Sequence, residues 1–334
     1  MDCDKITSEM QYVEKNGCCF NIDEKMRLGL AIKELKNDLG LKKVWLTGKI
    51  TGKYTTALAS WTRREVTFKF ENFLCGLLVS WVLALESPHR CSTEDPSLLF
   101  ELSFLLTVCL GIIKDYFIVS APVNGAMTPF WCSSSTWVFS ELPKQLENQE
   151  DLNKLKQINN LFTGEFDSVL FPGQGPPKVI DAEMGVFMQP KPITELDRLS
   201  YVVRQISDIY VVPKNFLKFV PAGHTVMNEA FRGISKDESF KLENWKFTRK
   251  PRNPEIKGMI ERGEAVYCSD CQDTVADDFP KNSWSLQTDA TGTVTTLKSH
   301  LWPGFYAYHR CNTNIAGFFY MGDGIRNSNL PFMV

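Results

Sequence analysis

The sequence predicts an α+β fold made of an N-terminal helix and hairpin, central helices and C-terminal antiparallel β-hairpins. Apolar residues recur with a helical period near residues 23–37 and 194–206. Residues 283–321 instead form short strand-like runs around turn residues. No shift in composition marks a boundary, so we expect residues 1–334 to form a single domain, interrupted by an apolar insert at 53–111.

The N-terminal region is expected to form one helix followed by three strands. Asn21 or Asp23 can cap a helix over residues 23–37, and Gly40 can end it. The apolar face of this helix is expected to hold Leu28, Ile32, Leu35 and Leu39. The strands are expected at residues 43–50, 112–120 and 130–139. Three aromatic residues of the third strand have the same parity and should share one face: Trp131, Trp137 and Phe139.

The central region is expected to be mainly helical. Residues 144–160 are compatible with a helix, and residues 194–206 favour one more strongly. Thr194 is the expected N-cap of the second helix, and Asp197 completes a capping-box pattern. Short strands are then expected at residues 209–212 and 216–220.

The last part of the chain is expected to form two antiparallel hairpins. Their strands are expected at residues 283–288, 293–299, 304–310 and 316–321. This part is rich in aromatic residues, which are enriched in both protein cores and interfaces. Tyr306 and Tyr308 share a face of one strand, whereas Phe319 points away from its neighbours Phe318 and Tyr320. We expect at least one of these faces to contact another chain.

The candidate structural and interface residues come from this region and from the third expected strand. A Trp-Pro-Gly sequence can form a rigid corner between two strands, because proline restricts the backbone and glycine permits the bend. The candidates are Trp137, Trp284, Trp302, Pro303, Gly304, Tyr306, Tyr308, Phe319, Gly322, Gly324, Pro331 and Phe332.

Composition argues against several classes of protein. The hydrophobic content of 43% and charged content of 23% are typical of a globular protein. The net charge of −2 gives no basic excess for phosphate contacts, so no nucleic-acid partner is expected. The N-terminus lacks the apolar stretch of a signal peptide, so we expect a cytoplasmic location and reduced thiols for the ten cysteines.

No catalytic or cofactor motif is found. Cys268 and Cys271 have metal-ligand spacing, and His300, His309 and Cys311 could complete a zinc site. No second motif of this kind is present, so two thiols in an exposed loop are the favoured interpretation. Nucleophile-elbow and phosphate-loop motifs are also absent from the sequence. We therefore expect a protein that is not an enzyme and that needs no cofactor or metal.

Two apolar runs, residues 73–85 and 98–113, are unusual for such a chain. A membrane hairpin built from them is one alternative, although both are shorter than the roughly 20 residues that span a bilayer. A second hypothesis is a retained intron or gene-model artefact. Codons for Gly52-Lys53-Tyr54 can contain a splice donor, and codons for Leu102–Gly111 can contain a pyrimidine tract and acceptor in the same phase. Removal of residues 53–111 would leave one continuous hairpin.

Several C-terminal motifs resemble the radial spoke head protein 9 family. They are Pro280–Ser285, Ser299–Gly304, Tyr320–Gly324 and Asn329–Val334, together with His224–Ile234. The Trp-Pro-Gly and Gly-x-Gly elements are similar to those of spoke head proteins 4 and 6. This chain departs from the family pattern at the insert, at Cys268 and Cys271, and at His300.

The resemblance implies a structural subunit of the radial spoke head in the axoneme of cilia and flagella, within the cytoskeleton. It also implies partners: spoke head proteins of the 4/6 family, the spoke stalk and central pair projections. Such a subunit would be required for spoke head assembly and for motility, through signalling from the central pair to dyneins. A membrane-anchored ciliary adaptor that uses the apolar residues 73–113 is the alternative.

Overall fold

The computed structural model describes residues 3, 6–17, 19–55, 112–123, 126–173, 178–181, 186–188, 191–220, 225–265 and 267–332. The chain divides into two compact units, of which the first comprises residues 1–52 and 115–334 and the second residues 53–114. The apolar run 73–85, most of the run 98–113 and most of the hypothetical intron lie outside the described residues.

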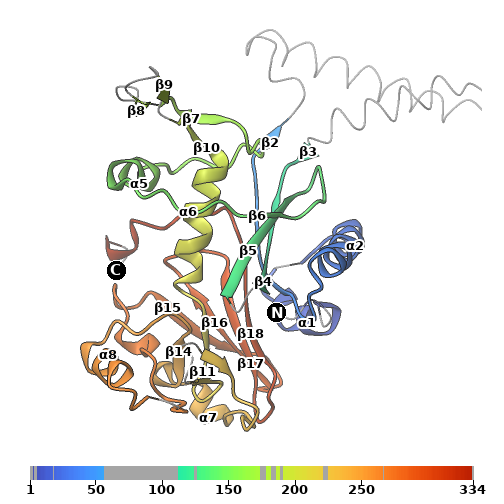
Figure 1. Ribbon diagram of the computed structural model, residues 1–334. Helices are drawn as coiled ribbons and strands as arrows, with labels where there is room; N and C mark the ends of the chain where they lie inside the picture. The colour runs from blue at the N-terminus through green and yellow to red at the C-terminus, as the bar shows by residue number, and fades with distance from the viewer. Residues whose placement is uncertain are drawn as a thin grey trace, which may run out of the picture. The chain divides into compact units, whose positions relative to one another are not determined.

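The first unit has the expected α+β character (Figure 1). Its helices are α1 (Ile6–Glu14), α2 (Ile22–Leu39), α5 (Gln149–Lys156), α6 (Glu195–Ser207), α7 (Lys236–Ser239) and α8 (Pro254–Glu261). Single 3₁₀ turns are η2 (Leu242–Asn244), η3 (Val275–Asp277) and η4 (Leu330–Phe332).

An eight-stranded sheet with the order β15-β16-β17-β18-β1-β4-β5-β6 forms the centre of this unit. Its strands are β1 (Trp45–Ile50), β4 (Tyr116–Val123), β5 (Ala126–Ser133), β6 (Ser140–Glu141), β15 (Trp284–Thr288), β16 (Val294–Ser299), β17 (Phe305–Arg310) and β18 (Ala316–Gly322). Both expected C-terminal hairpins are therefore confirmed.

The remaining strands form two-stranded pairs. In the first unit these are β7 (Val169–Phe171) with β10 (Ile193–Thr194), β8 (Lys178–Asp181) with β9 (Val186–Met188), β11 (Val211–Pro213) with β14 (Trp245–Phe247), and β12 (Leu217–Phe219) with β13 (Thr225–Met227). In the second unit, β2 (Tyr54–Thr55) pairs antiparallel with β3 (Ile112–Ile113).

The hairpin expected on the two sides of the insert is also present. β1 pairs antiparallel with β4, with Ile50 opposite Tyr116 and Trp45 opposite Ser120. The other edge of β1 runs parallel to β18, where Ile50 lies opposite Gly322. β1 thus joins the N-terminal hairpin and the C-terminal hairpins into one sheet.

Capping residues mark the ends of the two helices that the sequence predicts most strongly. α2 begins after Asn21, whose side chain and Glu24 form a capping box, and it ends at Gly40 in the left-handed conformation. α6 begins after Thr194, and Asp197 completes its capping box as expected. The expected apolar face of α2 is wrong only at Leu39, which is the last residue of the helix and is 44% exposed.

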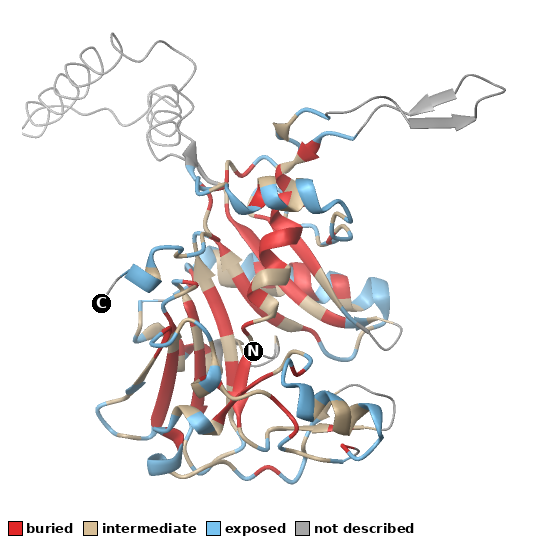
Figure 2. Ribbon diagram, turned by 90° about the vertical axis from the view of Figure 1, so that its left-hand side faces the viewer, coloured by how far each residue is buried: buried red, intermediate tan, exposed pale blue. Residues whose placement is uncertain are grey.

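The two faces of the sheet carry separate hydrophobic clusters. Figure 2 colours much of the sheet and of α6 as buried. Residues of α6 pack on the face that includes Tyr116 and Ile118. Residues of α1 and α2 pack on the opposite face, which includes Phe117 and Val119. Successive β4 residues therefore enter opposite clusters, which accounts for the nearly continuous apolar sequence of this strand.

The expected third strand is too long at its C-terminal end. β5 ends at Ser133, and the backbone N–H of Trp137 donates to the Ser133 carbonyl across a turn. Trp137 has a φ of 55°, so the alternation of a strand does not extend to it. Consequently Trp131 lies in one cluster, whereas Trp137 and Phe139 pack against the other.

His309 is a fully buried histidine on β17. Its Nε2 accepts a hydrogen bond from the backbone N–H of Ile234 at 3.2 Å. Its Nδ1 lies 3.1 Å from the Ile315 carbonyl oxygen, so the neutral tautomer that carries its proton on Nδ1 satisfies both contacts. Burial lowers the pKa of His309, although the hydrogen bonds to Ile315 and Ile234 act in the opposite direction.

We predict that acid destabilises the fold through His309. As the pH falls, the histidine of the unfolded chain is protonated near the ordinary histidine pKa of about 6.5, whereas the buried His309 of the folded chain is protonated only at lower pH. The free energy of unfolding should therefore fall as the pH drops through and below about 6.5. His309→Gln should be less stable than wild type at pH 7.5 but should lose less stability between pH 7.5 and 5.5. His300→Gln is the matched control, because His300 is exposed. Thermal melting at several pH values measures both, and equal slopes for wild type and His309→Gln would contradict the prediction.

Candidate interaction site

Four of the candidate aromatic residues belong to the core of the chain. Trp284 and Trp302 are 8% and 4% exposed and lie in the cluster beneath α6. Tyr308 and Phe319 are fully buried in the opposite cluster, beneath α1 and α2. These side chains stabilise the sheet from both of its faces. The expectation of contact with another chain stays a prediction for the candidates that reach the surface.

The candidate side chains that reach the surface lie in three places. Pro303 is exposed, and Tyr306 is partly buried on the same side of the sheet as Tyr308. At the C-terminal end, Pro331 is exposed and Phe332 is 85% exposed in η4. Trp137 is half-buried, and its ring lies 5.0 Å from that of Phe117.

The Trp-Pro-Gly corner connects β16 to β17. The N–H of Trp302 donates to Ser299 Oγ at 3.3 Å, and the Trp302 carbonyl accepts from the N–H of Phe305 at 3.1 Å. Gly304 has a φ of 97°, and a Cβ there would collide with the Met321 carbonyl group. The Gly304 carbonyl in turn accepts from the N–H of Met321 at 2.8 Å. The corner is therefore held against the end of β18.

The Gly-Asp-Gly sequence after β18 packs against this corner. A Cβ on Gly322 would meet the Pro303 carbonyl oxygen and the Tyr320 ring, so only glycine fits there without a shift of its neighbours. The N–H of Gly324 donates to the Tyr320 hydroxyl at 2.8 Å. The Gly322 carbonyl accepts from the N–H of Thr51 at 2.9 Å, which ties this turn to the end of β1.

An open cleft of about 700 Å³ lies beside the corner. Its lining includes Pro303, Tyr306, Met321, Asp323 and Arg326. The lining combines a half-buried aromatic ring with charged and polar groups, and none of the lining residues is a histidine or a cysteine. The structure thus brings Pro303, Gly304, Tyr306 and Gly322 together at one surface, while Trp137 and Phe332 are not part of this lining.

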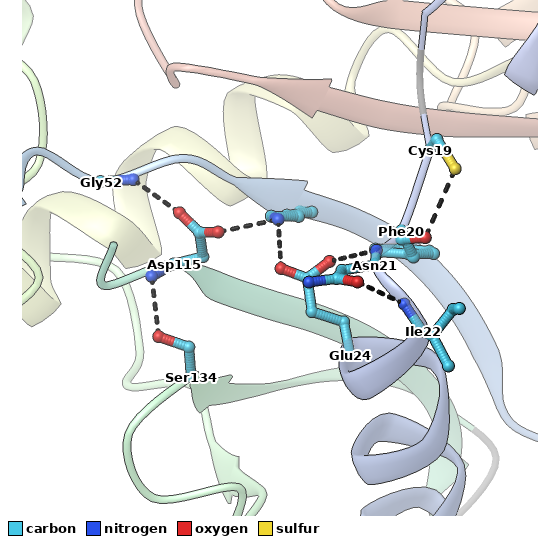
Figure 3. A network of polar contacts seen from close by, with 9 residues as sticks. Cys19, Phe20, Asn21, Ile22, Glu24, Gly52, Asp115 and Ser134 are labelled. Carbon is cyan, nitrogen blue, oxygen red and sulfur yellow. Dashed lines mark hydrogen bonds and ion pairs between the residues drawn. The ribbon is translucent and has the colours of Figure 1, made fainter. Parts of the chain in front are cut away.

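A second polar centre, the junction clamp, closes the point at which the chain leaves the first unit and returns to it. Asp115 Oδ1 accepts a hydrogen bond from the N–H of Gly52 at 3.2 Å. The backbone N–H of Asp115 donates to Ser134 Oγ at 3.0 Å (Figure 3). Lys49 Nζ lies 2.7 Å from Asp115 Oδ2 and 2.7 Å from Glu24 Oε1. We call these five residues the junction clamp.

The charges of the junction clamp are largely withdrawn from solvent. The side chains of Lys49 and Asp115 are 12% and 4% exposed. Burial lowers the pKa of Lys49, but the hydrogen bonds to Asp115 and Glu24 outweigh this effect, so its pKa is raised overall. Lys49 therefore remains charged, and its positive charge compensates two carboxylates that burial would otherwise destabilise.

Glu195 is a buried carboxylate at the start of α6. Its Oε1 accepts from the Tyr116 hydroxyl at 2.9 Å and from the N–H of Gly164 at 2.9 Å. Its Oε2 accepts from the N–H and the hydroxyl of Thr163, and from Ser168 Oγ at 3.3 Å. Burial, together with the charge and hydrogen bond of Glu195, raises the pKa of the Tyr116 hydroxyl. The arrangement connects α6, β4 and the 163–168 loop without leaving a reactive group free.

The cysteine expectation is wrong for one pair. Cys268 and Cys271 are joined by a disulfide, because the turn between them brings their Cα atoms to 6.0 Å, within the range that a disulfide spans. They are therefore neither reduced thiols nor free metal ligands here. Within the described ranges, no group of three or more His, Cys, Asp or Glu side chains could hold a metal ion. A search of those same residues finds no helix both long and apolar enough to span a membrane.

Sequence reasoning missed the buried carboxylates. Glu195 resembles any acidic residue in the first turn of a helix, and Asp115 and Lys49 resemble surface charges that flank a turn. The only local hint is that Asp115 and Lys49 interrupt apolar strand segments. Their roles depend on partners from distant parts of the sequence, which no local pattern could identify.

Aromatic packing on both faces and buried ion pairs hold the large sheet of the first unit together. No protein-family model matches the chain. It is similar to the radial spoke head protein 9 homolog of Bos taurus, with 30% identity over 231 residues that cover 67% of this chain and 82% of the relative. The Homo sapiens homolog is 30% identical over 236 residues with the same coverage.

The Danio rerio homolog is 39% identical over 143 residues, which cover 42% of this chain and 52% of that relative. The chain belongs to the radial spoke head protein 9 family. This finding confirms the resemblance that the C-terminal motifs indicate.

We predict that the junction clamp stabilises the first unit. Asp115→Ala leaves Lys49 with one partner in a mostly buried position, so it should lower the free energy of unfolding by about 3–5 kcal/mol. Asp115→Asn should cost less, because an amide oxygen can still accept from Gly52. Asp38→Ala, on the exposed surface of α2, should change stability by about 0.5 kcal/mol or less. Urea unfolding measures all three variants.

A double-mutant comparison identifies the source of this effect. Asp115→Ala should cost less in a Lys49→Met background, because no ammonium group is then left without its partner. If Asp115→Ala is no more destabilising than Asp38→Ala, the clamp has no structural importance.

Proposed function

We propose that this chain is a structural subunit of the axonemal radial spoke head, required for assembly of the head. The observation that carries this proposal is its similarity to radial spoke head protein 9 homologs over 82% of their length. The structure supports it in two ways. The described residues form a large sheet beside which the buried carboxylates of Asp115 and Glu195 are hydrogen-bonded, and exposed candidate residues remain in η4.

In this proposal the partners are spoke head proteins of the 4/6 family, with the spoke stalk and central pair projections as further contacts. The chain would lie in the axoneme of a cilium or flagellum, and its role in motility would be mechanical, in the signalling from the central pair to dyneins. Pro331 and Phe332 are proposed as contact residues, because they expose apolar surface that the described part of the chain does not cover.

We predict that the chain co-purifies from axonemal extracts with spoke head proteins of the 4/6 family. Phe332→Ala should leave the fold intact, because its side chain is 85% exposed, yet it should weaken co-purification several-fold.

Trp302→Ala should instead lower the free energy of unfolding by about 3–5 kcal/mol, because it empties a packed site, and should thus lower the amount of assembled head. Pull-down with quantitative mass spectrometry and thermal melting separates the two effects.

The outcome that contradicts this proposal is sedimentation of the extracted chain as a free protein without spoke components. Normal spoke heads and normal beating in a Trp302→Ala strain would show that the Trp-Pro-Gly corner is dispensable.

We also propose that residues 1–52 and 112–334 form the functional domain and that residues 53–111 are dispensable. The junction clamp supports this, because Gly52 and Asp115 already lie within hydrogen-bonding distance of each other. Rejoining Gly52 to Ile112 would leave a short connection between Ile50 and Tyr116, which are opposite one another in the β1–β4 pair. The pairing therefore needs no residue of the insert.

We predict that a chain lacking Lys53–Gly111 is folded, soluble and able to join a spoke head. Its melting temperature should equal or exceed that of the full chain. The reason is that the free-energy cost of closing a loop falls by about 0.6 kcal/mol for each halving of its length. Parallel expression of both chains, followed by soluble yield and melting, makes the comparison. A deletion variant that unfolds while the full chain is stable and monodisperse would contradict the proposal. Sequencing of spliced transcripts tests the intron hypothesis separately, and consistent coverage across codons 53–111 would refute it.

A further inference from the structure

The disulfide between Cys268 and Cys271 joins residues only three apart in sequence. Stabilisation by a disulfide grows with the length of the loop that it closes, because a longer loop loses more freedom in the unfolded chain. This bond therefore contributes less to the fold than one that joins distant segments. Both cysteines belong to a small hydrophobic cluster with residues of α8 and Phe219, separate from the two clusters on the faces of the sheet. The large sheet does not depend on the bond.

The turn that carries the two cysteines is held by contacts that do not involve their sulfur atoms. The Cys268 carbonyl accepts a hydrogen bond from the N–H of Phe219 at 3.1 Å, and the N–H of Tyr267 donates to the Phe219 carbonyl at 2.9 Å. The hydroxyl of Ser269 donates to Asn215 Oδ1 at 3.1 Å. The backbone of the turn is thus attached to the end of β12 whether or not the two sulfurs are bonded.

Asp270, which lies between the two cysteines, adds two ion pairs to this attachment. Its Oδ1 lies 3.0 Å from Lys246 Nζ, and its Oδ2 lies 3.1 Å from Lys214 Nζ. Burial raises the pKa of Asp270, but the hydrogen bonds to Lys246 and Lys214 outweigh this effect, so its pKa is lowered overall. The charged carboxylate therefore holds the turn to β14 and to the residue that follows β11. Because the turn is held in this way, the two thiols should stay close together after reduction, at a high effective concentration for re-forming the bond.

The two cysteines differ in their accessibility to a reagent in solution. Cys271 is 3% exposed, whereas Cys268 is only partly buried. Exchange begins when a thiolate reaches one sulfur of a disulfide, and the other sulfur then leaves. Cys268 is accordingly the position open to attack, and Cys271 supplies the leaving sulfur.

We propose that Cys268 and Cys271 form a reversible thiol–disulfide exchange site whose reductant is a dithiol. A thiolate of the dithiol bonds to Cys268 Sγ, the Cys268–Cys271 bond breaks, and Cys271 leaves as a thiolate that takes up a proton. The second thiolate of the dithiol then attacks its own sulfur in the mixed disulfide and displaces Cys268, which is also protonated. The chain gains two electrons and two protons, and the dithiol becomes a disulfide. Excess oxidised dithiol drives the same steps in reverse.

Equilibration of the full chain with mixtures of reduced and oxidised dithiothreitol tests reversibility. Alkylation and peptide mass spectrometry should show Cys268 and Cys271 becoming reduced together in one two-electron transition, while circular dichroism shows that the fold is kept. Added oxidised dithiothreitol should restore the bond. Asp270→Ala should lower the ratio of reduced to oxidised dithiothreitol at the midpoint about threefold, because the turn is held less firmly. Asp38→Ala, on the exposed surface of α2, is the matched control and should leave the midpoint unchanged.

Single-cysteine variants test the direction of attack. In Cys271→Ser, oxidised glutathione should form a mixed disulfide on Cys268. In Cys268→Ser, the buried Cys271 should react about tenfold more slowly, because access limits its exchange. Peptide mass spectrometry assigns each adduct, which is necessary because the chain has ten cysteines. Melting temperatures verify that both variants are folded under the conditions of the reaction.

Reduction that occurs only as the chain unfolds would overturn the proposal, because the bond would then be a structural one. Two thiols that persist in excess oxidised dithiothreitol would overturn it as well. An unchanged midpoint in Asp270→Ala would refute the role given to its ion pairs, and equally fast modification of Cys271 in folded Cys268→Ser would refute the direction of attack. The measurements use the purified chain alone, so their result is independent of the proposed role in the spoke head.

Discussion

The position of β1 between β4 and β18 is the constraint on which the rest of the structure depends. β1 pairs antiparallel with β4 and parallel with β18, so residues from the two ends of the chain must meet before the sheet is complete. Its side chains enter both clusters, with Leu46 on one side of the sheet and Ile50 on the other. Gly48 lets the Tyr320 backbone and side chain approach closely, because a Cβ at this position would be in tight contact with both.

Buried charges secure the elements that surround this strand. The junction clamp holds the start of α2, Gly52 and Asp115 around Lys49 near the end of β1, and Glu195 holds α6 against β4. Burying a carboxylate is unfavourable unless its oxygens are satisfied, and in both places each oxygen has a partner. Because several partners must be present together, these groups favour one arrangement of the chain over alternative packings of similar apolar residues.

The distribution of exposed groups separates the packing residues from those available for assembly. Trp284 and Trp302 of the C-terminal hairpins are buried in the core, whereas Pro303 of the corner and Pro331 and Phe332 of η4 are exposed. The packed core and the exposed candidate residues are therefore separate in the structure. The proline and glycine residues of the corner fix its backbone beside the open cleft.

Local patterns in the sequence were sufficient for elements whose stabilising contacts are close in sequence. The capping residues of α2 and α6 and the C-terminal hairpins are of this kind, because each depends on residues within one turn or one short loop. The C-terminal motifs also indicated the family. Several other features were decided only by the tertiary structure: the parallel pairing of β1 with β18, the turn that removes Trp137 from its expected face, the Cys268–Cys271 bond and the burial of Glu195 and Asp115. The β1–β18 pairing and the buried carboxylates depend on groups that are far apart in sequence, so these contacts stabilise the protein only once the chain has folded. The position of Trp137 and the Cys268–Cys271 bond depend on the backbone geometry of a turn, which the residue pattern does not specify.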